Sequence, residues 1–259
     1  MRRGALSLEN ISFRYNVEEH DVVDAVSLEI PAQKVTAILG PNGAGKTSLL
    51  HLILGLLKPH AGQILVAGKQ HCDYSKREIS QRLGLVPQHE VIPFNFSVFE
   101  YVLLGRSPYL EPFQMPRETD YQIANQVLGD LGLSHLSAKP VTELSGGERQ
   151  MIHLARALAQ QTEILLLDEP TTHLDLGNQS RILNVLRDLS GQGITVLFTT
   201  HDPNAATFIA DNVILMDKGR IVEQGSVAET LTEGKLSAIY RVPVQVEQHN
   251  GRVMVLMKK

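Results

Sequence analysis

The 259-residue chain has little of the chemistry that secreted scaffolds, membrane-spanning proteins and nucleic-acid-coating proteins use. Its one cysteine, Cys72, permits no intrachain disulfide, which excludes a disulfide-stabilised secreted scaffold. The longest strongly apolar stretches, 49–57 and 164–167, are far shorter than the roughly 20 residues that a bilayer-spanning helix needs. The 24 basic and 28 acidic residues give a net charge of −4, so we expect no nucleic-acid partner.

Short apolar segments alternate along the chain with segments of helical periodicity. Residues 35–39, 164–167 and 194–199 are apolar enough for buried strands, whereas 148–161 and 178–189 carry apolar residues at helical spacing. Buried strands that alternate with amphipathic helices are typical of a sheet covered on both faces. The pattern therefore predicts an α/β fold with a mainly parallel sheet.

The whole chain is expected to form one domain with several parts. Alternating strands near the N-terminus predict an antiparallel β subdomain, which together with the α/β core occupies 1–87 and 163–240. The helix-rich stretch 88–162 interrupts the core and predicts an inserted helical subdomain. Residues 241–259 predict a C-terminal β-hairpin extension, because two short strand candidates are joined at Asn250-Gly251.

The segment Gly40–Thr47, GPNGAGKT, matches the phosphate-binding pattern G-x-x-x-x-G-K-[ST] at every fixed position. An apolar strand precedes it and a helix follows it, as the pattern requires. The glycines let backbone N–H groups surround phosphates, and the helix N-terminus adds positive potential. We expect Lys46 to reach the β- and γ-phosphates and Thr47 to bind Mg²⁺. The sequence thus predicts a P-loop NTPase core.

Two adjacent carboxylates end the apolar strand 164–167. Asp168 and Glu169 stand at the edge where ligands lie in open α/β sheets. We expect Asp168 to hold Mg²⁺ through water and Glu169 to orient or deprotonate the attacking water. His201 follows another strand and is expected to donate a hydrogen bond to the γ-phosphate. The alternatives are a solvated acidic pair and a structural histidine.

The segment Leu144–Glu148, LSGGE, forms a second helix start suited to binding an anion. One chain therefore has two phosphate-binding helix starts but only one P-loop. If two copies face each other head to tail, each nucleotide lies between the Lys46 loop of one copy and the Ser145 loop of the other. We expect such a symmetric dimer.

Together these segments resemble the ATP-binding cassette family over nearly the whole chain. Residues 40–47 resemble its Walker A motif, 144–148 its signature, 164–169 its Walker B motif and 174–175 its D-loop. The Leu-Ser-Gly-Gly signature is nearly diagnostic beside a P-loop. The resemblance implies an ATPase that uses ATP as substrate and Mg²⁺ as cofactor.

The resemblance also implies residue roles. Tyr15 resembles the aromatic residue that stacks on adenine, Gln88 the Q-loop glutamine and His201 the switch histidine. The expected catalytic residues are Glu169, His201, Lys46 and Gln88, and the expected Mg²⁺ ligands are Thr47, Gln88 and Asp168. The expected nucleotide contacts are Tyr15, Gly40, Pro41, Asn42, Gly43, Ala44, Gly45, Lys46, Thr47, Ser48, Ser145, Gly146, Gly147 and Glu148.

The chain has one cassette, no heptad run and no cysteine pair, which favours a transporter ATPase subunit over cassette proteins of translation or DNA repair. Residues 93–109, with Gly105-Arg106 and Pro108-Tyr109, resemble cassettes of iron-chelate, haem and cobalamin importers. A zinc or manganese importer subunit and a soluble non-transport ATPase are the alternatives. The resemblance implies a membrane permease as partner, a solute-binding protein acting indirectly, and a peripheral place at the cytoplasmic face of the membrane.

Six of the chain's 13 aromatic residues lie within residues 94–113. Either they form the small core of the helical subdomain, or they form a docking surface for the permease. Prolines and glycines interrupt the segment, so not all six rings can turn inward, and we favour docking. The six are Phe94, Phe96, Phe99, Tyr101, Tyr109 and Phe113.

Overall fold

The computed structural model of the protein forms two compact units. Unit 1 is made of Met1–Asp73 and Leu183–Lys259, and unit 2 of Tyr74–Ile182. These boundaries differ from the expected subdomain boundaries at 87/88 and 162/163, because two strands that we expected in the core group with the helices of unit 2. The structure describes residues 5–90, 92, 94–249 and 252–258.

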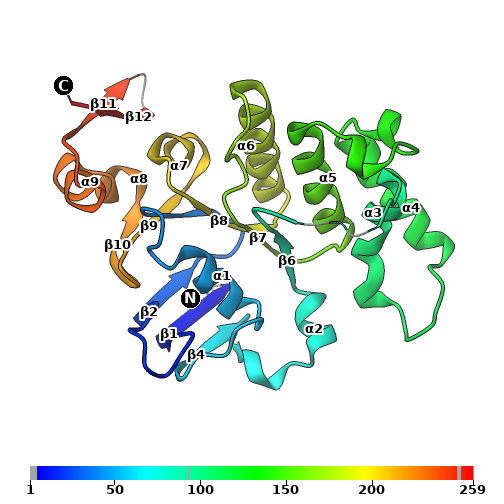
Figure 1. Cartoon of the computed structure of the whole chain (residues 1–259), viewed down its shortest axis with the longest axis horizontal. Coiled ribbons are helices and arrows are strands. Elements are labelled where there is room, and N and C mark those ends of the chain that lie inside the picture. The colour runs from blue at the N-terminus through cyan, green and yellow to red at the C-terminus, as the bar shows by residue number, and fades with distance from the viewer. Residues whose placement is uncertain (1–4, 91, 93, 250–251, 259) are drawn as a thin grey trace. The chain divides into compact units, whose positions relative to one another are not determined.

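The first sheet of unit 1 is antiparallel and has the strand order β2-β1-β4-β5, of which β2, β1 and β4 are labelled in Figure 1. In β2 the apolar residues Val23, Val26, Leu28 and Ile30 are buried, while most intervening residues reach solvent. One face of the sheet therefore packs on the core, as the alternating sequence predicts. The strands are β1 (Leu6–Phe13), β2 (Val23–Ile30), β4 (Ala61–Val66) and β5 (Lys69–Gln70).

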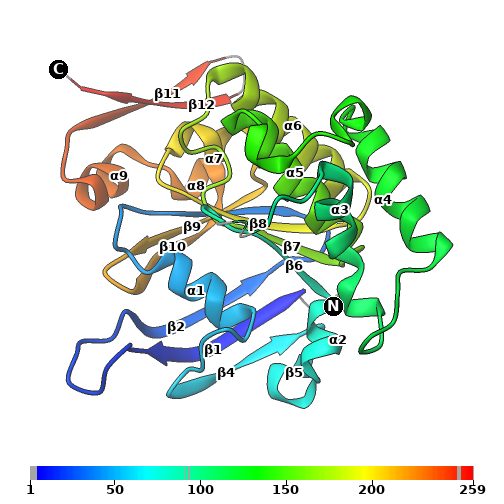
Figure 2. The same cartoon turned by 45° about the vertical axis from the view of Figure 1, so that its right-hand side comes forward.

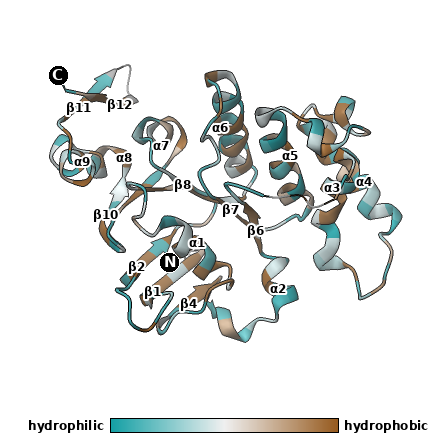
Figure 3. Cartoon of the chain, in the orientation of Figure 1, coloured by the Kyte–Doolittle hydropathy of each residue, from teal (hydrophilic) through white to brown (hydrophobic). Residues whose placement is uncertain are grey.

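The second sheet of unit 1 carries β3 (Val35–Leu39) between two parallel neighbours, β8 (Thr195–Thr200) and β9 (Asn212–Asp217). Every residue of β3 and β8 is buried, and β8 is coloured as hydrophobic along most of its length in Figure 3. β10 (Arg220–Ser226) adds an antiparallel edge to β9. The predicted α/β fold with parallel strands and a separate antiparallel sheet is confirmed.

The remaining elements of unit 1 are short helices and a C-terminal hairpin. The strands β11 (Val244–His249) and β12 (Arg252–Met257) pair antiparallel, as predicted, and Figure 2 shows them beside α7. The turn predicted at Asn250-Gly251 lies outside the described residues. The helices are α1 (Lys46–Ile53), η1 (His71–Asp73), α7 (Pro203–Ile209), α8 (Val227–Thr230) and α9 (Glu233–Tyr240).

Unit 2 contains helices together with β6 (Leu83–Val86) and β7 (Ile164–Leu167), which pair in parallel. The predicted helix at 148–161 is confirmed as α5 but begins two residues earlier, at Gly146. The helices of unit 2 are α2 (Lys76–Ser80), α3 (Val98–Leu103), η2 (Leu104–Tyr109), α4 (Glu118–Asp130), η3 (Ser134–Leu136), η4 (Val141–Glu143) and α5 (Gly146–Ala159). Helix α6 (Leu176–Gly191) begins in unit 2 and ends in unit 1. In the described part of the chain, no helix combines the length and apolarity that a membrane crossing requires.

The Gly105-Arg106 pair has a structural role in unit 2. Arg106 Nε lies 2.9 Å from Asp120 Oδ1, both side chains are buried, and Arg106 Nη1 donates to the carbonyl of Ala159. A Cβ atom on Gly105 would overlap the backbone of α5 at Arg156. The pair therefore joins η2 to α4 and α5.

The aromatic residues of 94–113 divide between core and surface. Tyr101 is 2% exposed, so its ring is core and belongs to no docking surface. The Arg106 guanidinium lies 4.0 Å from the centroid of the Tyr109 ring, and Tyr109 Oη donates to the carbonyl of Gln160. Phe94 and Phe113, by contrast, are 65% and 106% exposed. The expectation that all six aromatic residues of 94–113 contribute to a docking surface is therefore wrong for Tyr101. The rings of Phe94 and Phe113 are exposed and remain available to a partner.

Candidate nucleotide site

The glycine-rich loop lies in unit 1 between β3 and α1. Gly45 caps α1 at φ 99°, and a Cβ atom there would lie 2.5 Å from the carbonyl oxygen of Val22, so only glycine fits without strain. Lys46 is buried, and its Nζ donates to the carbonyl oxygens of Gly40 and Pro41 at 2.8 and 3.1 Å. Thr47 is exposed on the first turn of α1. The loop thus holds an ammonium group and a hydroxyl at a helix N-terminus, the arrangement that binds phosphate and Mg²⁺.

Tyr15 lies beside the start of the same helix. Its Oη is 3.0 Å from Ser48 Oγ on α1, and its ring and that of Phe13 form a T-shaped pair with 4.9 Å between centroids. The side chain is nevertheless 55% exposed. Contacts of the hydroxyl and of the ring therefore orient a side chain of which about half reaches solvent.

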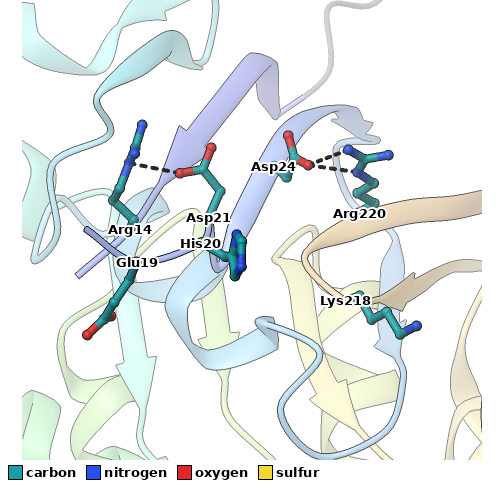
Figure 4. A pocket seen from close by; sticks show the side chains of 7 residues that line it. All are labelled: Arg14, Glu19, His20, Asp21, Asp24, Lys218 and Arg220. Atoms are coloured by element: carbon teal, nitrogen blue, oxygen red, sulfur yellow. Dashed lines mark hydrogen bonds and ion pairs between the residues drawn. The ribbon is translucent and has the colours of Figure 1, made fainter. Parts of the chain in front are cut away.

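The chain that follows Tyr15 is held by ion pairs around an open hollow of about 550 Å³ (Figure 4). Asp21 Oδ1 lies 3.1 Å from Arg14 Nε and 3.0 Å from His60 Nε2, so one carboxylate ties this segment to the residue before Tyr15 and to the residue that precedes β4. Asp24 pairs with Arg220 at 2.6 Å. Such exposed pairs add little stability, and their effect here is to fix the backbone next to Tyr15. The other lining residues are Glu19, His20 and Lys218.

His201 follows β8 directly and is exposed. Its carbonyl oxygen accepts a hydrogen bond of 2.9 Å from Tyr240 Oη, at the end of α9. Since both residues belong to unit 1, His201 shares that unit with the glycine-rich loop.

The acidic residues lie in unit 2, after β7. Asp168 is 5% exposed, and Glu169 adopts a positive φ of 45°, which turns the chain sharply after the strand. Glu169 Oε2 accepts from Thr172 Oγ1 at 3.0 Å and from Gln88 Nε2 at 3.4 Å. The structure therefore brings Gln88 together with Glu169, two residues that are 81 positions apart in the sequence.

Ser145 is the N-cap of α5 in a capping box. Its Oγ accepts from the Glu148 backbone N–H, while its own N–H and hydroxyl donate to Glu148 Oε2 at 2.9 and 2.8 Å. These two bonds hold the pKa of the Glu148 carboxyl below its usual range. Gly146 and Gly147 form the first turn of the helix, so the predicted anion-binding helix start is well ordered by its own side chains.

Asn178 links the signature segment to Asp175 and was missed in the sequence. Asp175 Oδ1 accepts from the Asn178 backbone N–H at 2.8 Å, and Oδ2 accepts from Asn178 Nδ2 at 2.7 Å. The backbone bond in particular lowers the pKa of Asp175. The Asn178 side chain also lies against Gly147. An aspartate placed three residues before an asparagine at a helix start was the available signal.

A second missed group surrounds Glu90, two residues after Gln88. Its Oε2 accepts from Tyr101 Oη at 2.7 Å and lies 3.2 Å from Arg156 Nη2 and 3.4 Å from His153 Nδ1. Burial lowers the pKa of His153 to about 4 and raises the pKa of Tyr101. The cluster ties the chain after Gln88 to α3 and α5, and nothing in the local sequence pattern pairs these residues.

Comparison with known proteins gives a consistent result. The model of the family described as ABC transporter matches residues 23–172. The molybdate import ATP-binding protein MolC of Haemophilus influenzae is 40% identical, over 94% of this chain and 91% of its own length. The iron(3+)-hydroxamate import ATP-binding protein FhuC of Bacillus subtilis is 34% identical, over 93% of this chain and 90% of its own length. A solved structure described as a metal-chelate type ABC transporter in an inward-facing conformation is 37% identical and has a TM-score of 0.86, covering 100% of this chain and 98% of that one.

Proposed function

This chain belongs to the ABC transporter family of ATPases, and we propose that it is the ATP-hydrolysing subunit of an importer whose permease is a separate chain. The observation that carries the proposal is the loop Gly40–Thr47, which holds the buried Lys46 ammonium at the N-terminus of α1. The importers among its relatives support the direction of transport.

We assign ATP binding to the Gly40–Ser48 segment and to Tyr15, whose exposed ring is suited to stacking on adenine. The Thr47 hydroxyl, the Asp168 carboxylate and the Gln88 amide are all hard oxygen donors, which is the set that Mg²⁺ prefers. Mg²⁺ would neutralise charge on the β- and γ-phosphates. Glu169 would hold the attacking water, and its bond from Thr172 Oγ1 supports that role because it orients the carboxylate.

A dimer completes the site. The capping box at Ser145 leaves the N-terminus of α5 and its glycines as a preorganised anion contact, but the same chain already has a phosphate loop. A second copy placed head to tail supplies the Ser145 segment to each nucleotide. Nucleotide binding would close the two copies, and hydrolysis would release them, which moves the permease between its two states.

The proposed solute is a metal chelate such as an iron–siderophore, haem or cobalamin. Similarity to FhuC and to the metal-chelate type transporter supports this class. Molybdate is a second candidate, since MolC is 40% identical to this chain. A zinc or manganese importer remains the alternative from the sequence. Uptake of each solute by cells that express the chain with its permease distinguishes them.

We place permease docking on the loop that follows η2. An open hollow of about 700 Å³ in unit 2 is lined by α2 and by residues 107–114, next to the exposed Phe113. Arg77 fixes this loop, because it donates to the carbonyls of Pro108 and Tyr109 and pairs with Glu111. A permease partner would hold the chain at the cytoplasmic face of the membrane, and a solute-binding protein would act through that permease.

The variant Glu169→Gln tests the ATPase proposal. The amide is nearly isosteric, so ATP binding should persist while turnover is lost. Gel filtration with ATP and Mg²⁺ should then show a dimer that wild type forms only transiently. The matched change Asp168→Asn should instead weaken Mg²⁺ binding, so that added Mg²⁺ raises the nucleotide affinity less than it does in wild type. A Glu169→Gln protein that stays monomeric and hydrolyses ATP normally refutes both the water-positioning role and the dimer.

A further inference from the structure

The segment that carries His201 is short and held at both ends. Thr200 ends β8, and its Oγ1 accepts from the Asp202 backbone N–H at 3.0 Å. Asp202 is the N-cap of α7, and its Oδ1 accepts from the Asn204 backbone N–H at 2.8 Å. His201 therefore lies in a short link between β8 and α7 whose backbone is held by Thr200 and Asp202. A hydrogen bond from elsewhere in unit 1 to this link therefore bears on the position of His201.

One outside contact comes from Tyr240, the last residue of α9. Tyr240 Oη donates to the carbonyl oxygen of His201 at 2.9 Å, across 39 positions of sequence. Tyr240 also lines a hollow of about 230 Å³ whose walls include Pro41–Ala44 of the phosphate loop. The same side chain thus reaches the backbone of His201 and borders the phosphate loop.

The other contact comes from the C-terminal hairpin. Asn204 Nδ2 donates to the carbonyl of Val255 at 3.0 Å, and Asn204 Oδ1 accepts from the Val255 backbone N–H at 2.9 Å. Val255 lies in β12 and is buried. The amide satisfies both backbone groups of one strand residue, as a neighbouring strand would, so it fixes both the distance and the orientation of α7 against the hairpin.

The hairpin is itself anchored to α9. Val244 N donates to Ser237 Oγ at 3.1 Å, and Val246 N donates to Glu233 Oε1 at 3.1 Å. The region from α9 to β12 is therefore one connected piece that meets the His201 segment at two points, Tyr240 and Asn204.

We propose that Tyr240 and Asn204 are positioning residues for ATP hydrolysis: Tyr240 holds the His201 carbonyl and Asn204 holds the start of α7 against the hairpin, so that the His201 imidazole is presented to the γ-phosphate. The proposal rests on the role assigned to His201. It gives the C-terminal α9–β12 region a part in turnover, since Tyr240 bonds to the His201 carbonyl and Val255 bonds to the Asn204 side chain in the helix that follows. A smaller effect on nucleotide binding is expected, because neither Tyr240 nor Asn204 is among the nucleotide contacts assigned above. A looser His201 segment lowers the fraction of bound ATP that is correctly oriented for hydrolysis.

The test compares Tyr240→Phe and Asn204→Ala in the full-length chain. Loss of one or two hydrogen bonds predicts kcat about two- to tenfold lower in each, with KM for ATP and the affinity for a fluorescent ATP analogue changed less than twofold. Tyr121→Phe is the matched control, because its ring stacks on Phe99 and no hydrogen bond of its hydroxyl occurs among the described residues. It should keep wild-type kcat.

Parallel measurement of His201→Ala separates the two levels of the proposal. If His201→Ala hydrolyses ATP normally, the role assigned to His201 is wrong. If His201→Ala loses turnover while Tyr240→Phe and Asn204→Ala keep wild-type kcat, only the positioning role is wrong. Loss of ATP affinity together with kcat in both variants would show a merely structural role and would also overturn the proposal. Two independent variants keep the test valid if one of them folds poorly.

Discussion

The side chain of Asn178 lies against Gly147, in the place that a Cβ atom on this glycine would occupy. Asn178 is in turn bonded to both oxygens of Asp175. Gly147 belongs to the signature segment, which is expected to face the second copy, and Asp175 to the D-loop, so the Asn178 side chain joins these two segments. The glycine is required here by contact and not by a positive φ.

Gly147→Ala should therefore disturb ATP turnover more than nucleotide affinity. The new methyl group must displace Asn178 and with it the bonds to Asp175, at a cost of about 1–3 kcal/mol for overpacking. ATPase assays should show at least a tenfold loss of kcat. The double variant Gly147→Ala/Asn178→Ala relieves the overlap and should regain part of the lost stability in thermal unfolding. If Gly147→Ala alone keeps the wild-type kcat, the contact between Gly147 and Asn178 does not contribute to ATP turnover.

Tyr15→Ala should weaken ATP binding by about tenfold or more, because base–aromatic stacking contributes about 1–3 kcal/mol. Tyr15→Phe separates the ring from the hydroxyl, since it keeps the stacking surface and removes only the bond to Ser48 Oγ. Equilibrium titration with a fluorescent ATP analogue should place Tyr15→Phe close to wild type. Unchanged affinity in Tyr15→Ala rejects the adenine contact, and equal losses in both variants would assign the effect to the hydroxyl.

The sequence predicted those parts of the site that are continuous in the chain. Gly40–Thr47 and Asp168-Glu169 were recognisable because strand, loop and helix follow each other within a dozen residues. Asn204 and Tyr240 were not, since their partners, Val255 and the His201 carbonyl, are backbone atoms that carry no sequence signal. Backbone atoms look the same at every residue, so only the folded chain reveals which of them a distant side chain reaches.

The Glu90 cluster shows the same limit in the interior of unit 2. Periodicity marks His153 as a member of a helix but gives no such signal for Tyr101, and their hydrogen bond depends on how α3 and α5 pack together. Arg106 was read as part of an importer-like pattern, whereas the structure shows a buried ion pair with Asp120. The sequence pattern thus singled out Arg106 without indicating that its role is a buried ion pair.

Buried His153 should make the protein less stable as the pH falls. Burial lowers its pKa to about 4, whereas an unfolded chain has an ordinary histidine pKa near 6.5. The unfolded state therefore binds the proton more readily, and stability that is complete above about pH 6.5 is lost progressively towards pH 4, by about 1.4 kcal/mol per pH unit at most. Urea unfolding of wild type and His153→Gln between pH 7.5 and 5 checks this.

His153→Gln removes the titrating group and should flatten the pH dependence of the unfolding free energy. His135→Gln, at an exposed position, is the control and should keep the slope of wild type. If wild type and His153→Gln lose stability in parallel over this range, other groups carry the acid sensitivity.

The docking prediction changes once the aromatic residues are placed. Tyr109 packs on Arg106 and bonds to Gln160, so its replacement would disturb the interior of unit 2 along with any surface. Phe113 and Met115 are 106% and 76% exposed and follow the loop that Arg77 fixes. They can be changed with little effect on the fold, which makes them the better probes of a partner surface.

The double variant Phe113→Ser/Met115→Ser should keep the basal ATPase activity of the isolated subunit and lose copurification with the co-expressed permease. Exposed apolar side chains on a fixed loop beside a hollow are typical binding hot spots, and truncation of such residues costs about 2 kcal/mol or more. Leu56→Ser, which is also exposed but lies after α1 in unit 1, controls for loss of surface apolarity and should leave assembly intact. If the double variant still assembles and supports solute uptake, docking lies on another surface. If Leu56→Ser also loses copurification with the permease, the loss of assembly reflects reduced surface apolarity in general, and the loop 107–115 is not the specific contact.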